Sequence, residues 1–153
     1  YEAAAVGEVN VVNKMKATNA IIGGEGNGGI IYPESHYGRD ALVGVALFLT
    51  HLAKSQMSVK ELRNTYPNYF ISKNKIQLEV GMDVDGILAN VAEEFASQEV
   101  DTTDGVKIYF GSEWVHLRKS NTEPIIRIYS ESADETKANE LAERIMDRIR
   151  AHA

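Results

Sequence analysis

The chain has 153 residues, no cysteine and a formal net charge of −6 at pH 7. The lack of cysteine excludes a disulfide framework, thiolate chemistry and a cysteine-ligated metal. The acidic balance argues against a general polyanion binder, and the longest apolar run, Ala41 to Leu49, is about half of the roughly 20 residues that a membrane span needs. We therefore expect a compact cytoplasmic protein without nucleic-acid or membrane partners. Because the chain opens at Tyr1 rather than at Met, in mid-pattern, we interpret it as a fragment or a processed product.

The first third of the chain predicts the remaining part of an α/β domain. The apolar positions near Val6 to Lys16 are compatible with a short helix. Ala20 to Ile22 is a short apolar run that ends in glycines, as expected of a buried strand entering a loop. From about Arg39 to Lys54 the sequence predicts a helix that is apolar almost all round and therefore buried, with Asp40 favourable at its N-terminus.

A glycine-rich loop, G-G-E-G-N-G-G from Gly23 to Gly29, follows the predicted strand. Its glycines let the backbone approach a ligand closely. Glu25 is the only charged group in the loop, and its carboxylate can accept hydrogen bonds from neighbouring hydroxyls of a pyranose, while Asn27 offers both a donor and an acceptor. A flexible turn with a solvated Glu25 is the alternative. A dinucleotide-binding loop is a weaker interpretation, because a glutamate would face the phosphates.

A short connection follows the apolar helix. The run S-V-K-E, from Ser58 to Glu61, is a capping box that opens a brief helix, and Pro67 closes it. We therefore predict three parts: residues 1–55 from the α/β domain, a linker over residues 56–74, and a C-terminal domain over residues 75–153.

The C-terminal part predicts an α+β fold. Its order of strand, helix, three strands and helix favours a four-stranded antiparallel sheet with both helices on one face. Asp83 is predicted to cap the first helix. Ser132 is predicted to start the second helix, in a capping box with Glu135. The predicted strands are Lys75–Val80, Val106–Phe110, Glu113–Arg118 and Ile125–Ser130. The predicted apolar helix faces comprise Ile87, Leu88, Val91, Ala92 and Phe95, and then Ala138, Leu141, Ala142, Ile145, Met146 and Ile149.

The run R-K-S-N-T-E-P-I-I-R, from Arg118 to Arg127, lies between two predicted strands. Arginine presents a planar fork of N–H donors that matches phosphate oxygens. Ser120, Asn121 and Thr122 add short polar donors and favour a tight turn, where backbone N–H groups can also face an anion. The run therefore predicts a phosphate site. The alternative is an ordinary polar hairpin turn with an exposed arginine at each side.

Three further candidates have weaker support. The run D-V-D-G, from Asp83 to Gly86, has the start of a calcium loop, but the other ligand positions do not follow. His36 and His116 are candidates for acid–base roles. His116 lies on a predicted strand, where a histidine is more often structural.

Two motifs resemble one family, the α-D-phosphohexomutases, which includes phosphoglucomutase, phosphomannomutase and phosphoglucosamine mutase. The spacing R-x-S-N-T-E-P-x-x-R is similar to the phosphate-binding loop of the family's last domain. G-G-E-G-N-G-G is similar to the sugar-binding loop of its third domain, usually written G-E-x-S-G-H. Asn27 replaces the usual serine and Gly29 the usual histidine. The resemblance covers nearly the whole chain, with both motifs in the family's order.

The resemblance implies a role for each loop. Glu25 and Asn27 would contact sugar hydroxyls. A second set of residues would hold the phosphate: Arg118, Ser120, Asn121, Thr122 and Arg127. The family's C-terminal domain is related to the TATA-binding-protein fold. The phosphoserine loop, like T-A-S-H-N-P, and the magnesium loop, like D-G-D-x-D-R, do not occur in the sequence, so no catalytic or metal-binding residue is assigned to this chain.

The expected parent is therefore a phosphohexomutase that interconverts hexose 1-phosphate and 6-phosphate through a phosphoserine outside this chain. It would need Mg²⁺, held elsewhere, and a hexose 1,6-bisphosphate activator. The expected partners are a phosphorylated hexose and the missing N-terminal domains, and the chain alone is expected to be inactive. The alternatives are a non-catalytic phosphosugar-binding or regulatory module, and a structural domain with idle loops. The sequence does not choose the sugar.

Overall fold

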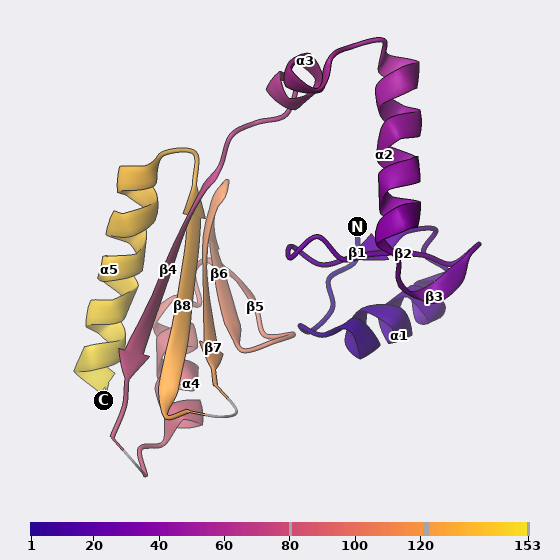
Figure 1. The fold of residues 1–153 in the computed structure, drawn as a ribbon. Helices are drawn as coiled ribbons and strands as arrows, with labels where there is room; N and C mark the ends of the chain where they lie inside the picture. The colour runs from indigo at the N-terminus through magenta and orange to yellow at the C-terminus, as the bar shows by residue number, and fades with distance from the viewer. Residues whose placement is uncertain (80, 121–122, 153) are drawn as a thin grey trace. The chain divides into compact units, whose positions relative to one another are not determined.

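The structure is a computed structural model that describes residues 1–79, 81–120 and 123–152. The chain divides into two compact units, Tyr1–Tyr66 and Pro67–Ala153, which are described separately. Figure 1 shows the elements of both.

Unit 1 holds a small three-stranded antiparallel sheet in the order β1-β2-β3. Its elements are α1 (Glu8–Thr18), β1 (Gly23–Gly24), β2 (Ile30–Tyr32), β3 (His36–Arg39), α2 (Ala41–Ser55) and α3 (Val59–Asn64). Its buried apolar residues are Met15, Ile31 and Leu62. A Cβ at Gly23 would overlap the Met15 side chain in its present position, so the glycine lets the sheet lie close to α1.

The starts of α2 and α3 follow the sequence. Ser58 and Glu61 form the predicted capping box of α3. Asp40 caps α2, where its carboxylate accepts a hydrogen bond from the Val43 N–H at 3.0 Å. This bond and a weaker one from His36 hold the pKa of Asp40 below its ordinary value. The carboxylate therefore stays ionised at the positive end of the helix dipole.

Two burial predictions for unit 1 are wrong. The run Ala20–Ile22 is not a buried strand: Ile21 is 81% exposed, and β1 comprises only the two glycines that follow. Helix α2 forms as predicted, but none of its residues is buried, and Leu42 is 82% exposed. A helix that is apolar all round needs neighbours on every side. Among the described residues, α2 packs mainly against β2 and α3, so most of its apolar surface is uncovered.

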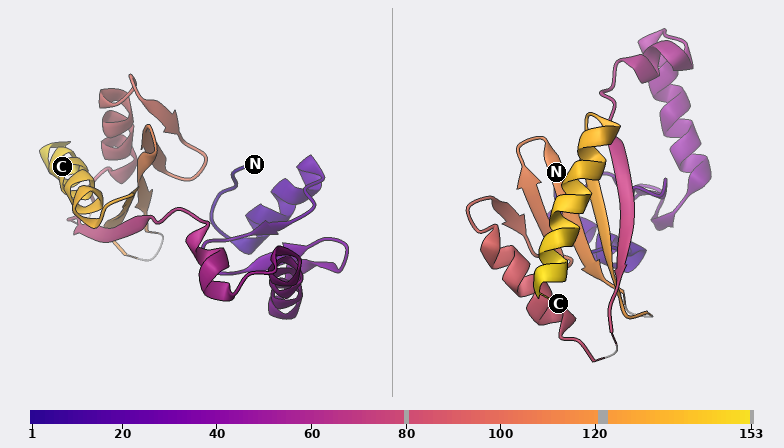
Figure 2. Two further views of the ribbon diagram at one scale, coloured as in Figure 1. Left: turned by 90° about the horizontal axis from the view of Figure 1, so that it is seen from above. Right: turned by 90° about the vertical axis from the view of Figure 1, so that its left-hand side faces the viewer.

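Unit 2 is a five-stranded antiparallel sheet in the order β4-β8-β7-β6-β5. Helices α4 and α5 lie side by side and cover one face of it (Figures 1 and 2). The elements are β4 (Phe70–Gln77), α4 (Val84–Glu94), β5 (Glu99–Asp101), β6 (Val106–Phe110), β7 (Glu113–Lys119), β8 (Ile125–Ser132) and α5 (Glu135–His152).

The core of unit 2 lies between the sheet and the two helices. Alternate residues of the central strands are fully buried there, among them Val115 and Leu117 of β7 and Ile126 and Ile128 of β8. All six predicted apolar residues of α5 are buried. On α4, the predicted face is also confirmed, because Ile87, Leu88 and Val91 are buried and Ala92 and Phe95 pack against them.

The structure corrects three predictions in unit 2. The sheet has five strands rather than four, because β5 pairs with β6 at the edge. Strand β4 begins at Phe70 rather than Lys75, so residues 70–74 of the predicted linker belong to the sheet. Ser132 ends β8 and does not cap α5; the Asp134 carboxylate accepts the Lys137 N–H at 3.1 Å instead. The end of the first predicted strand, Val80, lies outside the described residues.

Candidate functional site

The arginine-rich run forms the hairpin that joins β7 to β8, as its flanking alternation predicts. Arg118 and Arg127 lie directly opposite each other in the register of the two strands. The hairpin is closed by the Ser120 N–H, which donates to the Ile125 carbonyl at 3.0 Å. Asn121 and Thr122 lie outside the described residues. Two of the predicted phosphate-binding side chains are therefore neighbours, and a third begins the turn between their strands.

Both arginines belong to the face of the sheet opposite to α4 and α5. Their strand neighbours Leu117, Ile126 and Ile128 are fully buried against α4 and α5. Because side chains alternate along a strand, Arg118 and Arg127 project from the opposite face. Both are half-buried, which limits their motion while leaving the guanidinium groups accessible to a small ligand.

The two arginines differ in their local charge environment. The Arg118 guanidinium contacts the Asp104 carboxylate at 3.3 Å, and both groups are about one third exposed. The turn that carries Asp104 approaches β7 closely: a Cβ at Gly105, whose φ is +73°, would overlap the Leu117 carbonyl. Among the described residues, Arg127 has no ion-pair partner. The Asp104 contact positions one guanidinium, and the other has no counter-charge among the described side chains.

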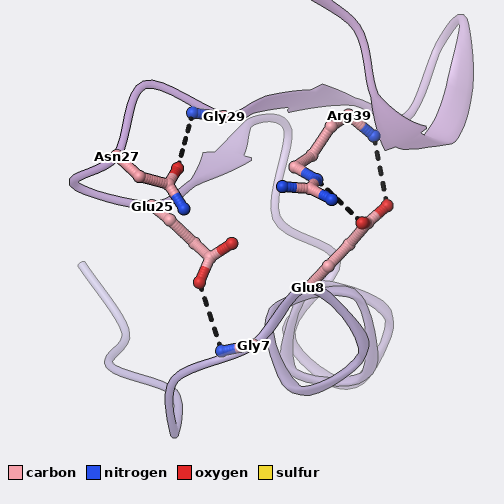
Figure 3. A network of polar contacts seen from close by, with 6 residues as sticks. All are labelled: Gly7, Glu8, Glu25, Asn27, Gly29 and Arg39. Atoms are coloured by element: carbon pink, nitrogen blue, oxygen red, sulfur yellow. Dashed lines mark hydrogen bonds and ion pairs between the residues drawn. The ribbon is translucent and has the colours of Figure 1, made fainter.

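The glycine-rich loop is a tight turn between β1 and β2. Backbone hydrogen bonds close it, from the Glu25 N–H to the Gly29 carbonyl at 3.1 Å and from the Gly28 N–H to the Glu25 carbonyl at 3.0 Å. The Asn27 side-chain oxygen accepts the Gly29 N–H at 3.0 Å (Figure 3). The amide nitrogen of the exposed Asn27 side chain remains available as a donor to a ligand.

Glu25 has a structural contact that the sequence does not reveal. One of its carboxylate oxygens accepts the Gly7 N–H at 3.2 Å, immediately before α1 begins (Figure 3). Among the described residues its other oxygen has no partner. Glu25 is half-buried, so one oxygen secures the helix start and the second can accept a further hydrogen bond.

An open hollow of about 460 Å³ lies beside the loop, and Gly28 and Gly29 contribute to its wall. Glu8 and Arg39 also line it and are joined by two contacts, from Arg39 Nε at 2.8 Å and from the Arg39 backbone N–H at 3.3 Å (Figure 3). Sequence reasoning missed this pair, because a contact between residues 31 positions apart leaves no local pattern. Glu25 does not line the hollow.

Both candidate histidines have local contacts. The His36 ring contacts the Asp40 carboxylate at 3.1 Å and is more than half exposed, next to the start of α2. His116 lies on the same face of β7 as Arg118, and its ring contacts the Asp104 carbonyl. The first contact joins two side chains, and the second joins β7 to the turn that carries Asp104.

Among the described residues, no group of three or more histidine or acidic side chains is arranged to hold a metal ion. None of the helices that the structure describes has the length and apolar character to cross a membrane.

Two family models together match residues 1–148 of the chain. Residues 1–69 match the family model described as phosphoglucomutase/phosphomannomutase, alpha/beta/alpha domain III. Residues 70–148 match the model described as phosphoglucomutase/phosphomannomutase, C-terminal domain.

Curated relatives agree with these models. The chain is 40% identical over 142 residues to a phosphoglucosamine/phosphogalactosamine mutase of Sulfurisphaera tokodaii, covering 92% of this chain and 31% of the relative. It is 43% identical over 140 residues to a phosphoglucomutase/phosphomannomutase of Thermococcus kodakarensis, covering 90% of this chain and 30% of the relative. The chain therefore spans about a third of the length of these relatives.

A solved structure supports the fold. The crystal structure of a phosphoglucomutase/phosphomannomutase family protein from Burkholderia thailandensis matches with a TM-score of 0.69 and 25% identity. The match covers 96% of this chain and 31% of that one.

Proposed function

Because this chain belongs to the phosphoglucomutase/phosphomannomutase family, we propose that it is the substrate-recognition part of a phosphohexomutase. The whole protein would interconvert a hexose 1-phosphate and a hexose 6-phosphate by phosphotransfer through a phosphoserine outside residues 1–153. The relatives bear names with different sugars, glucosamine and galactosamine in one case and glucose and mannose in the other. The proposed substrate class is therefore a phosphorylated hexose.

The observation that carries this proposal is the placement of Arg118 directly opposite Arg127 beside a polar turn. Like charges opposite each other on neighbouring strands destabilise a sheet. A bound phosphate would turn this repulsion into a pair of charge-assisted hydrogen bonds. Ser120 begins the turn, and we assign Asn121 and Thr122 of the turn to the same phosphate site.

The second part of the proposal assigns the sugar to Glu25 and Asn27. The unpartnered carboxylate oxygen of Glu25 can accept a sugar hydroxyl, and the amide of Asn27 can donate to one. We assign no catalytic step to this chain. We place the magnesium ion that the family resemblance implies outside this chain; among the described residues, no group of three or more histidine or acidic side chains is arranged to hold a metal ion.

The proposal that this chain binds the substrate but does not catalyse its turnover can be tested by a turnover assay on the 153-residue chain. We expect no interconversion of glucose 1-phosphate and glucose 6-phosphate, even with Mg²⁺ and glucose 1,6-bisphosphate present. Mass spectrometry should find no phosphoserine after incubation with the bisphosphate. The full-length protein under the same conditions is the control and should turn over. Turnover by the chain alone would contradict the proposal, and an inactive full-length protein would favour a non-catalytic phosphosugar-binding module.

A glutamine substitution separates the two uses of Glu25. Glu25→Gln keeps a side-chain oxygen for the Gly7 N–H but removes the negative charge. We expect it to weaken glucose 1-phosphate binding to the full-length protein roughly fivefold, or about 1 kcal/mol, because an amide nitrogen, which donates and does not accept, replaces the unpartnered carboxylate oxygen. Binding of inorganic phosphate should not change. Isothermal titration calorimetry with both ligands measures this.

The matched control for Glu25→Gln is Glu34→Gln. Glu34 lies in the next turn of unit 1 and accepts a hydrogen bond from the Tyr32 hydroxyl at 2.8 Å. Its substitution should leave both affinities unchanged. Equal losses of sugar phosphate and inorganic phosphate in Glu25→Gln would contradict the assignment of Glu25 to the sugar.

A further inference from the structure

A third basic residue lies in register with the two arginines. Lys75 of β4 pairs with Arg127 of β8, and Arg127 pairs with Arg118 of β7. The three residues therefore form one row across three neighbouring strands, which we call the cation row. Sequence reasoning did not single out Lys75, because 43 residues separate it from Arg118 and only the strand order β4-β8-β7 brings them together.

The cation row lies on one face of the sheet. Ile76, the neighbour of Lys75 on β4, packs against the core, so Lys75 projects from the face opposite to α4 and α5, as Arg127 and Arg118 do. Strands are spaced about 4.8 Å apart, so the row spans roughly 10 Å, and its long side chains can converge on one small anion. The Leu78 N–H donates to the Pro124 carbonyl at 2.9 Å, which fastens this end of β4 to the hairpin.

The other basic side chains on the three strands of the row have local partners. Lys119 contacts the Asp85 carboxylate at 2.6 Å. The Lys73 ammonium lies 5.6 Å from the centre of the Tyr129 ring. Arg118 has Asp104. Within the described part of the chain, Lys75 and Arg127 have neither a carboxylate nor an aromatic ring as partner.

Adjacent uncompensated charges of the same sign carry an energetic cost. In the cation row the repulsion is concentrated between Lys75 and Arg127, which are paired and lie beside the hairpin that joins β7 to β8. A phosphate monoester carries between one and two negative charges near neutral pH and has three acceptor oxygens. Its three oxygens match the three cations of the row in number, and its negative charge would offset the repulsion between the two cations without a carboxylate partner.

We infer that Lys75 is a third phosphate-binding residue, which completes the site of Arg118 and Arg127 from the neighbouring strand. This inference rests on the proposed function, since it places a further residue in the same site. The Lys75 side chain contributes an ammonium group to the phosphate, whereas the pairing of β4 with β8 depends on its backbone. Its removal therefore weakens ligand binding without weakening the fold.

The test compares Lys75→Gln with Lys73→Gln in the full-length protein. The two lysines lie on the same strand and the same face, two residues apart, and each substitution removes one positive charge. Calorimetry with glucose 1-phosphate should show roughly tenfold weaker binding for Lys75→Gln, as expected for one charge-assisted hydrogen bond. Lys73→Gln should stay within about twofold of the wild type, because Lys73 stacks on Tyr129. Lys75→Arg should restore most of the affinity.

The melting temperature separates a binding role of Lys75 from a structural role, because the loss of a structural contact would lower it. Without ligand, Lys75→Gln should melt at the same temperature as the wild type or slightly higher, because the substitution relieves repulsion. Inorganic phosphate should stabilise the variant less than the wild type. A lower melting temperature with unchanged affinity, or equal affinity losses in Lys75→Gln and Lys73→Gln, would overturn the inference.

Including Arg127→Ala in the same series separates the inference from the proposed function. If Arg127→Ala weakens binding and Lys75→Gln does not, the phosphate site stands and the role of Lys75 is wrong. If neither substitution weakens binding, the assignment of the phosphate to this hairpin is wrong as well.

Discussion

Replacing Arg127 by alanine is expected to weaken binding of a hexose phosphate to the full-length protein by about 1.5–3 kcal/mol, the value of a hydrogen bond to a charged group. The guanidinium lies opposite Arg118, next to the hairpin turn, and has no ion-pair partner in the described part of the chain. We therefore expect a bound phosphate to supply its counter-charge. Calorimetry gives the loss in affinity, and steady-state kinetics should show it mainly as a higher KM.

The control for Arg127→Ala is Arg150→Ala. Arg150 also forms part of unit 2, but it lies on the exposed side of α5 and contacts Asp147 at 2.7 Å. Its loss should leave affinity and KM within experimental error, because exposed ion pairs contribute little. If Arg127→Ala and Arg118→Ala both bind hexose phosphate as the wild type does, the hairpin is not the phosphate site.

The largest effect on stability is expected from Ile145→Ala on α5. Ile145 is completely buried between the helix and the sheet. Truncating a buried isoleucine to alanine removes apolar contact and leaves a cavity, which costs about 2–5 kcal/mol. Trp114, the only tryptophan, lies on β7 of the same unit, so its fluorescence during urea denaturation follows the unfolding of unit 2.

Two further variants of α5 serve as controls for the stability loss of Ile145→Ala. Ile145→Val should cost only about 0.5–1.5 kcal/mol, because it removes a single methyl group. Glu140→Ala, at an exposed position of α5, should change stability by less than about 0.5 kcal/mol. A loss below about 1 kcal/mol for Ile145→Ala would contradict the described packing of α5 on the sheet.

Elements with a strong local pattern could be predicted from the sequence. The α5 residues from Ala138 to Ile149 repeat at helical spacing, and the same residues are buried in the structure. The capping side chains Ser58 and Asp83 accept hydrogen bonds from N–H groups three residues later, as their positions predict. Such features depend on a few neighbouring residues, so a short stretch of sequence is enough to predict them.

Features that depend on distant neighbours could not be predicted. Strand β5 has only three residues, and its pairing with β6 defines it rather than its own pattern. The apolar helix α2 shows that composition predicts a need for burial but not the presence of a partner. Ser132, next to an apparent capping box, belongs to a strand because β4 pairs along its whole length.

The candidate site also combines features that the local sequence predicts with features that depend on distant neighbours. The sequence indicates that Arg118 and Arg127 flank a turn, but only the strand register shows that they lie directly opposite each other. Lys75 joins them through the order of three strands, and Glu25 reaches Gly7 across 18 positions. Motifs identify the chemical groups of the site, whereas the fold determines which groups are neighbours.

The most direct test of the phosphate site is a crystal structure of the full-length protein with glucose 1-phosphate bound. The proposed function predicts that the phosphate oxygens lie within hydrogen-bond distance of the Arg118 and Arg127 guanidinium groups and of the turn that begins at Ser120. A phosphate bound elsewhere, with no anion at the hairpin between β7 and β8, would contradict it.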